Sequence, residues 1–375
     1  MKKIISTLII AIFCFANIAN ATTQNEGKEK NISNVNISIG DWKINGKVNG
    51  KIYISDDSKK DNKGRTKLGD SDIVTYSNGK INIEIAEEKL NETLAKWESA
   101  LADCDIVFDV NNNNPTRITG SGNIISKDIP AIASYDAIKA SRGIHVVMTD
   151  EESDKITIHA DDNVMPYVVV RKSGESLVIT IDENIKSINS VNVKVLLPKH
   201  TALNELKVAS GASISIKPTI KGRSLSVDAS SAGEVNIAKA EVEFFDADAS
   251  SAAKISGTVK SDDCYADASS AADIDLNVLA VQCKSNASSG AKIELEGEVA
   301  TFEGNASSAA KIIAKELAAR NLADASASSG AKISVNPTKK LRARASSAGT
   351  VTYVPSDDLL KDINQSSGGR VKTQF

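Results

Sequence analysis

Ala249-Ser250-Ser251-Ala252-Ala253-Lys254-Ile255 is one copy of the motif that decides the fold of this chain. The motif is a small residue, two serines, two small residues, any residue, then Ile or Val. It recurs from Ala229, Ala268, Ala287, Ala306, Ala327 and Ala345, with degenerate copies at Ala209 and Ser366. From Ser230 to Ser366 the second-position serines are spaced by 20, 19, 19, 19, 21, 18 and 20 residues. A period near twenty indicates a solenoid of stacked repeats.

Each repeat contains short β-type runs, such as Leu225-Ser226-Val227 and Glu234-Val235-Asn236-Ile237, and shows no helical spacing. The Leu and Asn framework of leucine-rich repeats is absent from the sequence. Three short strands and three bends per repeat predict an all-β fold. It is a right-handed parallel β-helix with about 19–21 residues per coil, stacked at the strand spacing of about 4.8 Å.

The motif also predicts which side chains face inward. Its small residues leave room for a sharp corner, and its stacked serine hydroxyls could hydrogen-bond along the rod. The Ile or Val that follows returns to the core. Four positions before each small residue lies an almost wholly apolar column, which we expect to be buried: Leu225, Phe245, Cys264, Cys283, Phe302, Ala323 and Leu341.

Two polar columns are expected on the surface. Immediately before the small residue stand Asp228, Asp248 and Asp267, followed by Asn286 and Asn305. Such an acidic ladder is a weak candidate for Ca²⁺ binding through oxygen ligands. After the corner, a basic stripe interrupted by Asp273 is a candidate glycan-facing surface: Lys254, Lys292, Lys311 and Lys332. The alternative for both columns is an ordinary solvated surface of mixed charge.

Cys264 and Cys283 occupy one column on adjacent coils. Their Cα atoms are expected near the strand spacing, which a disulfide tolerates. The alternative is a pair of buried free thiols that act as small hydrophobic side chains. No CxxC motif is present, and His145, His159 and His200 are not spaced as a metal site. We therefore expect no cofactor.

Four regions follow along the chain. Residues 1–21 resemble a secretory signal peptide, with Lys2 and Lys3 before an apolar stretch and Ala19-Asn20-Ala21 as the cleavage site. Residues 22–115 form a β-rich region, 116–200 the irregular first coils of the β-helix, and 201–375 its regular repeats. Export to the periplasm, the outer-membrane surface or the medium is expected.

The region 22–115 carries mixed signals. Alternation over 35–39 and 81–85 predicts two strands, and the charged segment 56–72 predicts a loop between them. Leu90, Leu94, Trp97 and Leu101 predict one amphipathic helix over 86–102. We expect this region to cap the N-terminal end of the rod, since an open coil end exposes unpaired strand groups.

Composition limits the function classes. The 45 basic and 48 acidic residues nearly balance, so nothing points to a nucleic-acid partner. Aromatic residues make up only 4% of the chain, which is few for holding sugar rings. Coils of 18–21 residues leave no room for the long loops that wall the cleft of β-helical polysaccharide lyases and hydrolases. These features disfavour an enzyme.

Several motifs together resemble one known family. They are Ser134-Tyr135-Asp136-Ala137-Ile138, Gly143-Ile144-His145-Val146, Ala160-Asp161-Asp162-Asn163 and the ASSGAK-type repeats. Over about 134–355 the chain is similar to the head GIN domain proteins, also called DUF2807 or auto-transporter adhesins, which are common in Bacteroidetes. The resemblance implies a secreted or envelope β-helix.

The sequence therefore favours an exported, adhesin-like binding or structural module without enzymatic activity. The alternative is a β-helix that binds or degrades a polysaccharide. A surface glycan or an envelope protein is the expected kind of partner. Self-association through the last coil, near Val371, is a further hypothesis.

Overall fold

A computed structural model describes residues 117–132 and 134–374, together with the backbone of five strands between Lys28 and Ile85. The chain divides into two compact units, Met1–Asn114 and Pro115–Phe375. The expected signal peptide, the expected helix over 86–102 and Cys104 lie outside the described residues.

The first unit contains one sheet in the order β2-β1-β5-β4-β3. Its strands are β1 (Lys28–Ile39), β2 (Trp42–Ile54), β3 (Arg65–Lys67), β4 (Ile73–Ser77) and β5 (Lys80–Ile85). The two expected strands are confirmed, because 35–39 lies in β1 and pairs in parallel with 81–85 of β5. The prediction of an uninterrupted loop over 56–72 was wrong, since β3 lies within it and pairs with β4.

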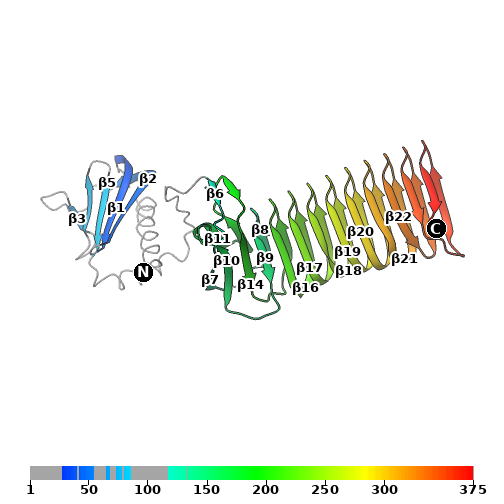
Figure 1. Cartoon of the computed structure of the whole chain (residues 1–375), viewed down its shortest axis with the longest axis horizontal. Helices are drawn as coiled ribbons and strands as arrows, with labels where there is room; N and C mark the ends of the chain where they lie inside the picture. Colours follow the sequence, from blue (N-terminus) through cyan, green and yellow to red (C-terminus); the bar gives the residue numbers. More distant parts are fainter. Residues whose placement is uncertain are drawn as a thin grey trace. The chain divides into compact units, whose positions relative to one another are not determined.

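The second unit is a parallel β-helix, as predicted (Figure 1). Its regular coils are formed by the long strands β16 (Ser213–Ala229), β17 (Glu234–Ala249), β18 (Lys254–Ala268), β19 (Asp273–Ala287), β20 (Lys292–Ala306) and β21 (Lys311–Ala327), and by the shorter β22 (Lys332–Pro337), β23 (Lys340–Ala345), β24 (Thr350–Tyr353), β25 (Leu360–Gln365) and β26 (Arg370–Thr373). Among the described residues the one helical element is a 3₁₀ turn, η2 (Met165–Tyr167). No helix in this described part is long and apolar enough to cross a membrane.

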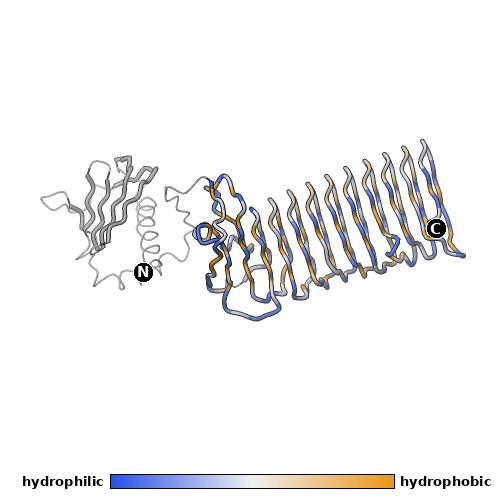
Figure 2. Tube along the Cα trace, in the orientation of Figure 1, coloured by the Kyte–Doolittle hydropathy of each residue, from blue (hydrophilic) through white to orange (hydrophobic). Residues whose placement is uncertain are grey.

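Strand β17 shows how one coil is built. Inward and outward side chains alternate along it, which Figure 2 displays as alternating colours on every coil. The alternation is interrupted by the exposed pairs at 238–239 and 243–244 and by the corner at 250–252. Three interruptions give the three faces that the sequence predicts for each coil.

The predicted inward column is confirmed. Its members pair in register from Leu225 through Phe245 to Leu341, and each is at most 1% exposed. The ring of Phe302 needs the glycine two residues later, because a Cβ on Gly304 would lie 2.8 Å from that ring. Large and small side chains thus pack together in one continuous core.

Each corner is a tight turn with two successive left-handed residues. In the corner after β17, φ is 52° at Ser251 and 61° at Ala252, and the N–H of Ala253 donates to the carbonyl of Ser250 (3.1 Å). Positive φ at both central positions is the signature of a type I′ turn. Small residues are therefore required for backbone conformation as well as for space.

Backbone groups join successive corners. The N–H of Ala252 donates to the carbonyl of Ser270 on the next coil (3.1 Å). The expectation that serine hydroxyls hydrogen-bond along the rod was wrong for the described corners, where no bond joins two serine side chains. Among the described residues, two hydroxyls bridge neighbouring coils at Ser141 and Thr180, whose oxygens are 2.8 Å apart. In the corners the left-handed backbone makes the contacts between coils instead.

Replacing the left-handed alanines with glycine is expected to stabilise the solenoid. Ala252, Ala271 and Ala309 have φ near 60°, whereas Gly290 and Gly330 occupy the equivalent position in other corners. Each Ala→Gly change should add about 0.5–1 kcal/mol, because relief of left-handed strain exceeds the entropic cost of glycine. Thermal unfolding of the triple variant measures the gain. The control, Ala253→Gly at a buried extended position, should lower Tm.

The first coils depart from sequence order. They use β6 (Arg117–Thr119), β7 (Ile124–Pro130), β8 (Ala137–Ala140), β9 (His145–Met148), β10 (Lys155–Asp161), β11 (Val168–Ser173), β12 (Ser176–Ile181), β13 (Ser187–Asn189), β14 (Val193–Leu197) and β15 (Glu205–Val208). Strands β8 and β9 pair in parallel with β12 and β14 on one side and with β15 and β16 on the other. The coil at 137–148 therefore lies between two coils that follow it in the chain.

Antiparallel strands cover the N-terminal end of this β-helix. Strand β10 pairs with β14 and with β7, and β11 pairs with β12. The strand edges of the outermost coil are thus satisfied within the second unit. Residues 124–173 therefore cover this end within the second unit. The capping role expected of 22–115 stays a prediction.

Candidate functional site

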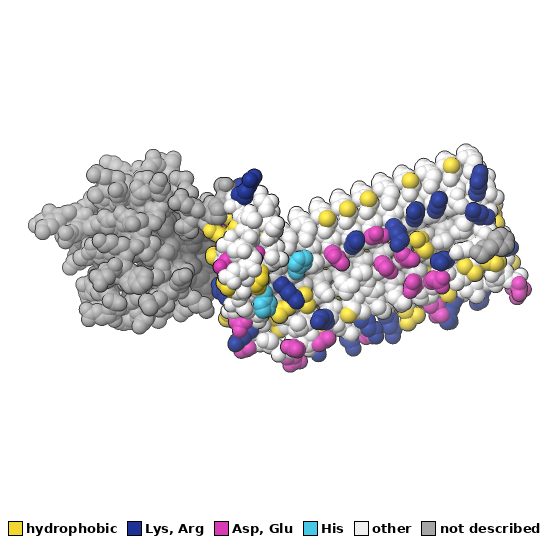
Figure 3. Space-filling view, viewed as in Figure 1, with side chains coloured by type: hydrophobic (Ala, Val, Ile, Leu, Met, Phe, Trp, Pro, Cys, Tyr) yellow, Lys and Arg dark blue, Asp and Glu magenta, His cyan; other side chains and the backbone are white. Residues whose placement is uncertain are grey.

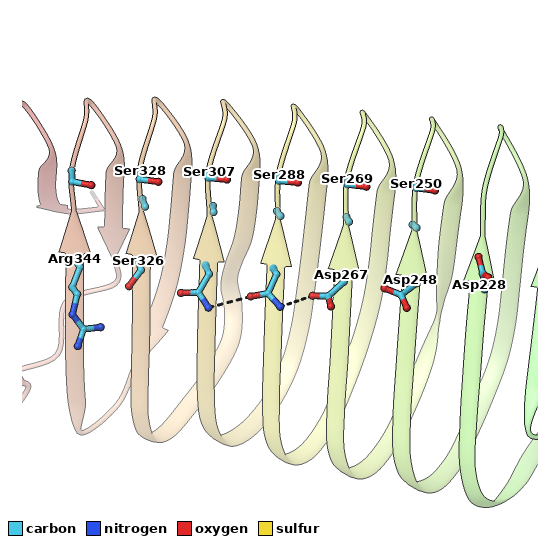
Figure 4. A pocket seen from close by; sticks show the side chains of 18 residues that line it. Asp228, Asp248, Ser250, Asp267, Ser269, Ser288, Ser307, Ser326, Ser328 and Arg344 are labelled. Atoms are coloured by element: carbon cyan, nitrogen blue, oxygen red, sulfur yellow. Dashed lines mark hydrogen bonds between the residues drawn. The ribbon is translucent and has the colours of Figure 1, made fainter.

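A polar groove follows one face of the regular coils. It has a volume of about 710 Å³ and extends over the seven coil positions from Asp228 to Arg344. One side is the column immediately before the corner, and the other side is the row of first serines of the corners (Figure 4). The groove is lined by Asp228, Asp248, Ala249, Ser250, Asp267, Ala268, Ser269, Asn286, Ala287, Ser288, Asn305, Ala306, Ser307, Ser326, Ala327, Ser328, Arg344 and Ser346.

The centre of the groove carries a chain of side-chain hydrogen bonds, which we call the amide ladder. The side-chain amide of Asn305 donates to Oδ1 of Asn286 (3.1 Å), and that of Asn286 donates to Asp267 (2.6 Å). Asn305 also donates to Glu303 (3.2 Å). Asparagine is long enough to bridge neighbouring coils, and these bonds hold the amides in fixed orientations.

The charged residues at the two ends of the groove have partners outside it. Nζ of Lys207 donates to the carboxylate of Asp228, which raises the pKa of that lysine. Arg344 at the other end donates to Asp324 (3.0 Å), which also binds Arg342 (3.1 Å). The terminal charges of the groove are therefore neutralised by neighbouring side chains.

The acidic part of the groove is electrostatically unfavourable. Burial raises the pKa of Asp246 and of Asp248, and repulsion from neighbouring aspartates raises both further. A carboxyl whose native pKa exceeds its unfolded value binds more protons in the native state. Stability is therefore lost as the pH rises through the raised pKa, and this penalty is fully present at pH 7.

Asp248→Asn is expected to relieve this penalty. At pH 7 we expect a rise in Tm of about 1–2 °C, because one repelling charge is removed. Below about pH 3 the carboxyl is protonated in both states, so the gain should disappear. Thermal unfolding of both proteins across this range measures the difference. An equal gain at both ends of the range would contradict the electrostatic explanation.

The aspartates of the acidic ladder are aligned as expected, but their carboxylates do not gather around one point. Asp228, Asp248 and Asp267 are in-register neighbours on successive strands. Within the described residues, no group of three or more Asp, Glu, His or Cys side chains is placed to hold a metal ion. Calcium binding remains a prediction, to be tested by comparing unfolding in Ca²⁺ and in EDTA.

The basic stripe follows the corner on the side away from the groove. Lys254, Asp273, Lys292, Lys311 and Lys332 form one column in register. Lys292 pairs with Glu294 (2.6 Å), which raises the pKa of the lysine. Figure 3 shows a row of basic and acidic side chains on one face, below small hydrophobic groups along the edge. We call Lys254, Lys292, Lys311 and Lys332 the lysine column. The glycan-binding role of the lysine column stays a prediction.

Cys264 and Cys283 are in-register neighbours in the core. Both are free thiols, and a hydrogen bond with Cys283, together with burial, raises the pKa of Cys264. Parallel in-register neighbours hold their Cβ atoms about 4.8 Å apart, whereas a disulfide prefers about 3.8 Å. Bond formation would therefore require the two coils to move together.

We expect these two thiols to be unreactive in the native protein and both reactive after denaturation. Burial and the scarcity of thiolate prevent reaction in the folded state. A thiol titration of the Cys104→Ser variant, prepared as the mature chain without reductant, measures both states. No reactive thiol after denaturation would instead establish the disulfide.

One serine–histidine pair was not anticipated from the sequence. Nδ1 of His145 and Oγ of Ser213 are 2.8 Å apart on an exposed surface. Nucleophilic catalysis also needs a group that orients the histidine. Among the hydrogen bonds of the described residues, His145 has no carboxylate partner. The pair has the geometry of a surface hydrogen bond between coils.

The sequence of the whole solenoid can now be compared with known proteins. A family model described as "Putative auto-transporter adhesin, head GIN domain" (DUF2807) matches residues 134–264 and 249–356. The chain belongs to this family. The head GIN region therefore includes the groove and the lysine column. A search of curated proteins found no match.

A solved structure shares the fold of this head GIN chain, and a second is less similar. A "putative adhesin" from Parabacteroides merdae ATCC 43184 is 21% identical, with a TM-score of 0.51 over 69% of this chain and 99% of that one. A "putative lipid binding protein" from Parabacteroides distasonis ATCC 8503 is 19% identical, with a TM-score of 0.47 over 69% of this chain and 100% of that one. At 21% identity the likeness to the Parabacteroides merdae protein concerns the fold alone.

Proposed function

We propose that this head GIN protein is an exported binding module of the cell envelope or the surrounding medium, without enzymatic activity. It holds its ligand along the polar groove. The observation that carries this proposal is the amide ladder, in which hydrogen bonds fix the side chains at the centre of an open groove. Preorganised polar groups lose little freedom when a ligand binds, which favours affinity.

The family supports this proposal, since its description is that of an adhesin. The apolar N-terminal segment with Ala19-Asn20-Ala21 supports export. The regular coils from β16 to β21 join one another through corners of four residues, so long loops do not wall the groove. An open face with repeating side chains suits binding to an extended surface better than catalysis in a closed site.

The alternative is a polysaccharide-degrading enzyme. The acidic part of the groove favours it, because aspartates with a raised pKa such as Asp248 are candidates for general acid catalysis. The enzyme predicts that soluble sugar is released from the polysaccharide. The binding module predicts that the protein is retained on the polysaccharide and that no sugar is released.

A glycan array paired with a reducing-sugar assay tests the proposal on the purified mature chain. Retention on the array without release of reducing sugar is expected. Release of reducing sugar would replace the binding module with the enzyme. Cell fractionation with protease shaving tests export, and recovery of the chain in the cytoplasm would contradict it.

A further inference from the structure

We infer that the ligand of the polar groove is a single uncharged, polyhydroxylated chain, that is, a neutral glycan lying parallel to the axis of the solenoid. This inference rests on the proposed function and specifies the ligand class. Four properties of the groove support it: its width, its satisfied backbone, its charge and its hydrogen-bonding groups.

The groove is long and narrow. Its seven coil positions are separated by six steps of about 4.8 Å, so it is about 29 Å long. Its volume of about 710 Å³ over that length gives a mean cross-section of about 25 Å². An α-helix, about 10 Å in diameter, has a cross-section roughly three times larger. The groove therefore accepts one extended chain.

The backbone along the groove is already hydrogen-bonded. The N–H of Ser269 donates to the carbonyl of Ala249 (2.9 Å), and the N–H of Ser288 donates to the carbonyl of Ala268 (3.0 Å). A peptide that adds to a sheet requires free main-chain groups at an edge. The main-chain groups named above are already bonded between coils, so side chains must recognise the ligand.

The charge of the groove disfavours an ionic polymer. Lys207 and Asp324 neutralise the two ends, and the centre consists of amides and hydroxyls. A polyanion would meet the carboxylates of Asp248 and Asp267. A polycation would gain only from the acidic part, which is three of the seven coil positions.

The remaining groups suit the hydroxyls of a sugar chain. Asn305 uses both amide N–H groups within the protein, which leaves its Oδ1 as an acceptor. The first serine of each corner adds a hydroxyl that can donate and accept. Tyr265, 40% exposed, stands beside Asp246 on the adjacent outward column, where its ring can pack against the apolar face of a sugar.

Affinity electrophoresis of the mature chain tests the inference with three classes of dissolved polymer. The neutral class contains dextran, mannan, xylan and hydroxyethylcellulose; heparin is the polyanion and chitosan the polycation. We expect at least one neutral polymer to retard the protein, with little change when NaCl is raised to about 0.5 M. Retardation by heparin or chitosan alone would overturn the inference, as would none by any polymer.

Variants locate the binding surface. Asn286→Ala with Asn305→Ala should weaken retardation by the neutral polymer about tenfold or more, the equivalent of 1.4 kcal/mol. Ser288→Leu fills the groove without altering the amide ladder and should have a similar effect. Circular dichroism and Tm confirm that each variant is folded. The matched control, Lys311→Ser with Lys332→Ser, alters the lysine column and should bind like the parent.

The outcomes separate this inference from the proposed function. Binding that survives both groove variants and is lost in the lysine variant would overturn the groove as the ligand site, here and in the proposed function, while an exported binding module without enzymatic activity would stand. Release of reducing sugar from the retarding polymer would overturn the proposed function.

Discussion

Phe302→Ala is expected to lower the free energy of unfolding by about 3–5 kcal/mol, the usual cost of removing a buried phenylalanine ring. Phe302 is 1% exposed, and its neighbours in the inward column are Cys283 and Ala323. These small side chains cannot fill the space that the ring leaves. Urea or thermal unfolding followed by circular dichroism measures the loss.

The matched control is Glu303→Ala on the same strand. Glu303 is partly exposed, pairs with Lys284 (3.3 Å) and accepts from the side-chain amide of Asn305 (3.2 Å), so its removal should cost about 1 kcal/mol or less. Stability in a solenoid depends on contacts between neighbouring coils. Hydrogen exchange in Phe302→Ala should therefore rise most in β19, β20 and β21. Equal losses in both variants would contradict the assignment of Phe302 to the core.

The inward column and the corners could be predicted because both depend on local sequence. One coil occupies one period, so equal positions in successive motifs become neighbours, as Phe245 and Cys264 do. The same period predicts a corner of small residues at Ser251 and Ala252, although only the structure shows that their backbone is left-handed. Where register alone determines the contacts, the sequence is sufficient.

Long-range pairing could not be predicted. The coil at 137–148 lies between β12 and β15, and nothing in its own sequence specifies that its neighbours come later in the chain. The groove was missed for a related reason. Asp228, Asn286 and Asn305 were recognised as a column, but the direction of the amide hydrogen bonds and the partners Lys207 and Asp324 depend on side-chain geometry.

Asp161→Ala is expected to destabilise the first coils by about 2–5 kcal/mol, because two backbone N–H groups would lose their hydrogen bonds to a charged, fully buried acceptor. Asp161 is fully buried, and its carboxylate accepts from the N–H of Gly122 (2.7 Å) and from the N–H of Asn192 (2.7 Å). It thereby joins the turn after β6 to the start of β14. Thermal unfolding and hydrogen exchange at 117–197 measure the loss.

The neighbouring residue is the control for this carboxylate. Asp162 lies on the surface and binds Ser121 and Asn123, contacts that lower its pKa. Asp162→Ala should leave Tm almost unchanged, since water can replace these bonds. Gly120→Ala should resemble Asp161→Ala, because its Cβ would lie 2.6 Å from Oδ2 of Asp161 and 2.3 Å from the carbonyl of Ser190. If Asp161→Ala and Asp162→Ala proved equally mild, the buried carboxylate would not be what holds these turns together.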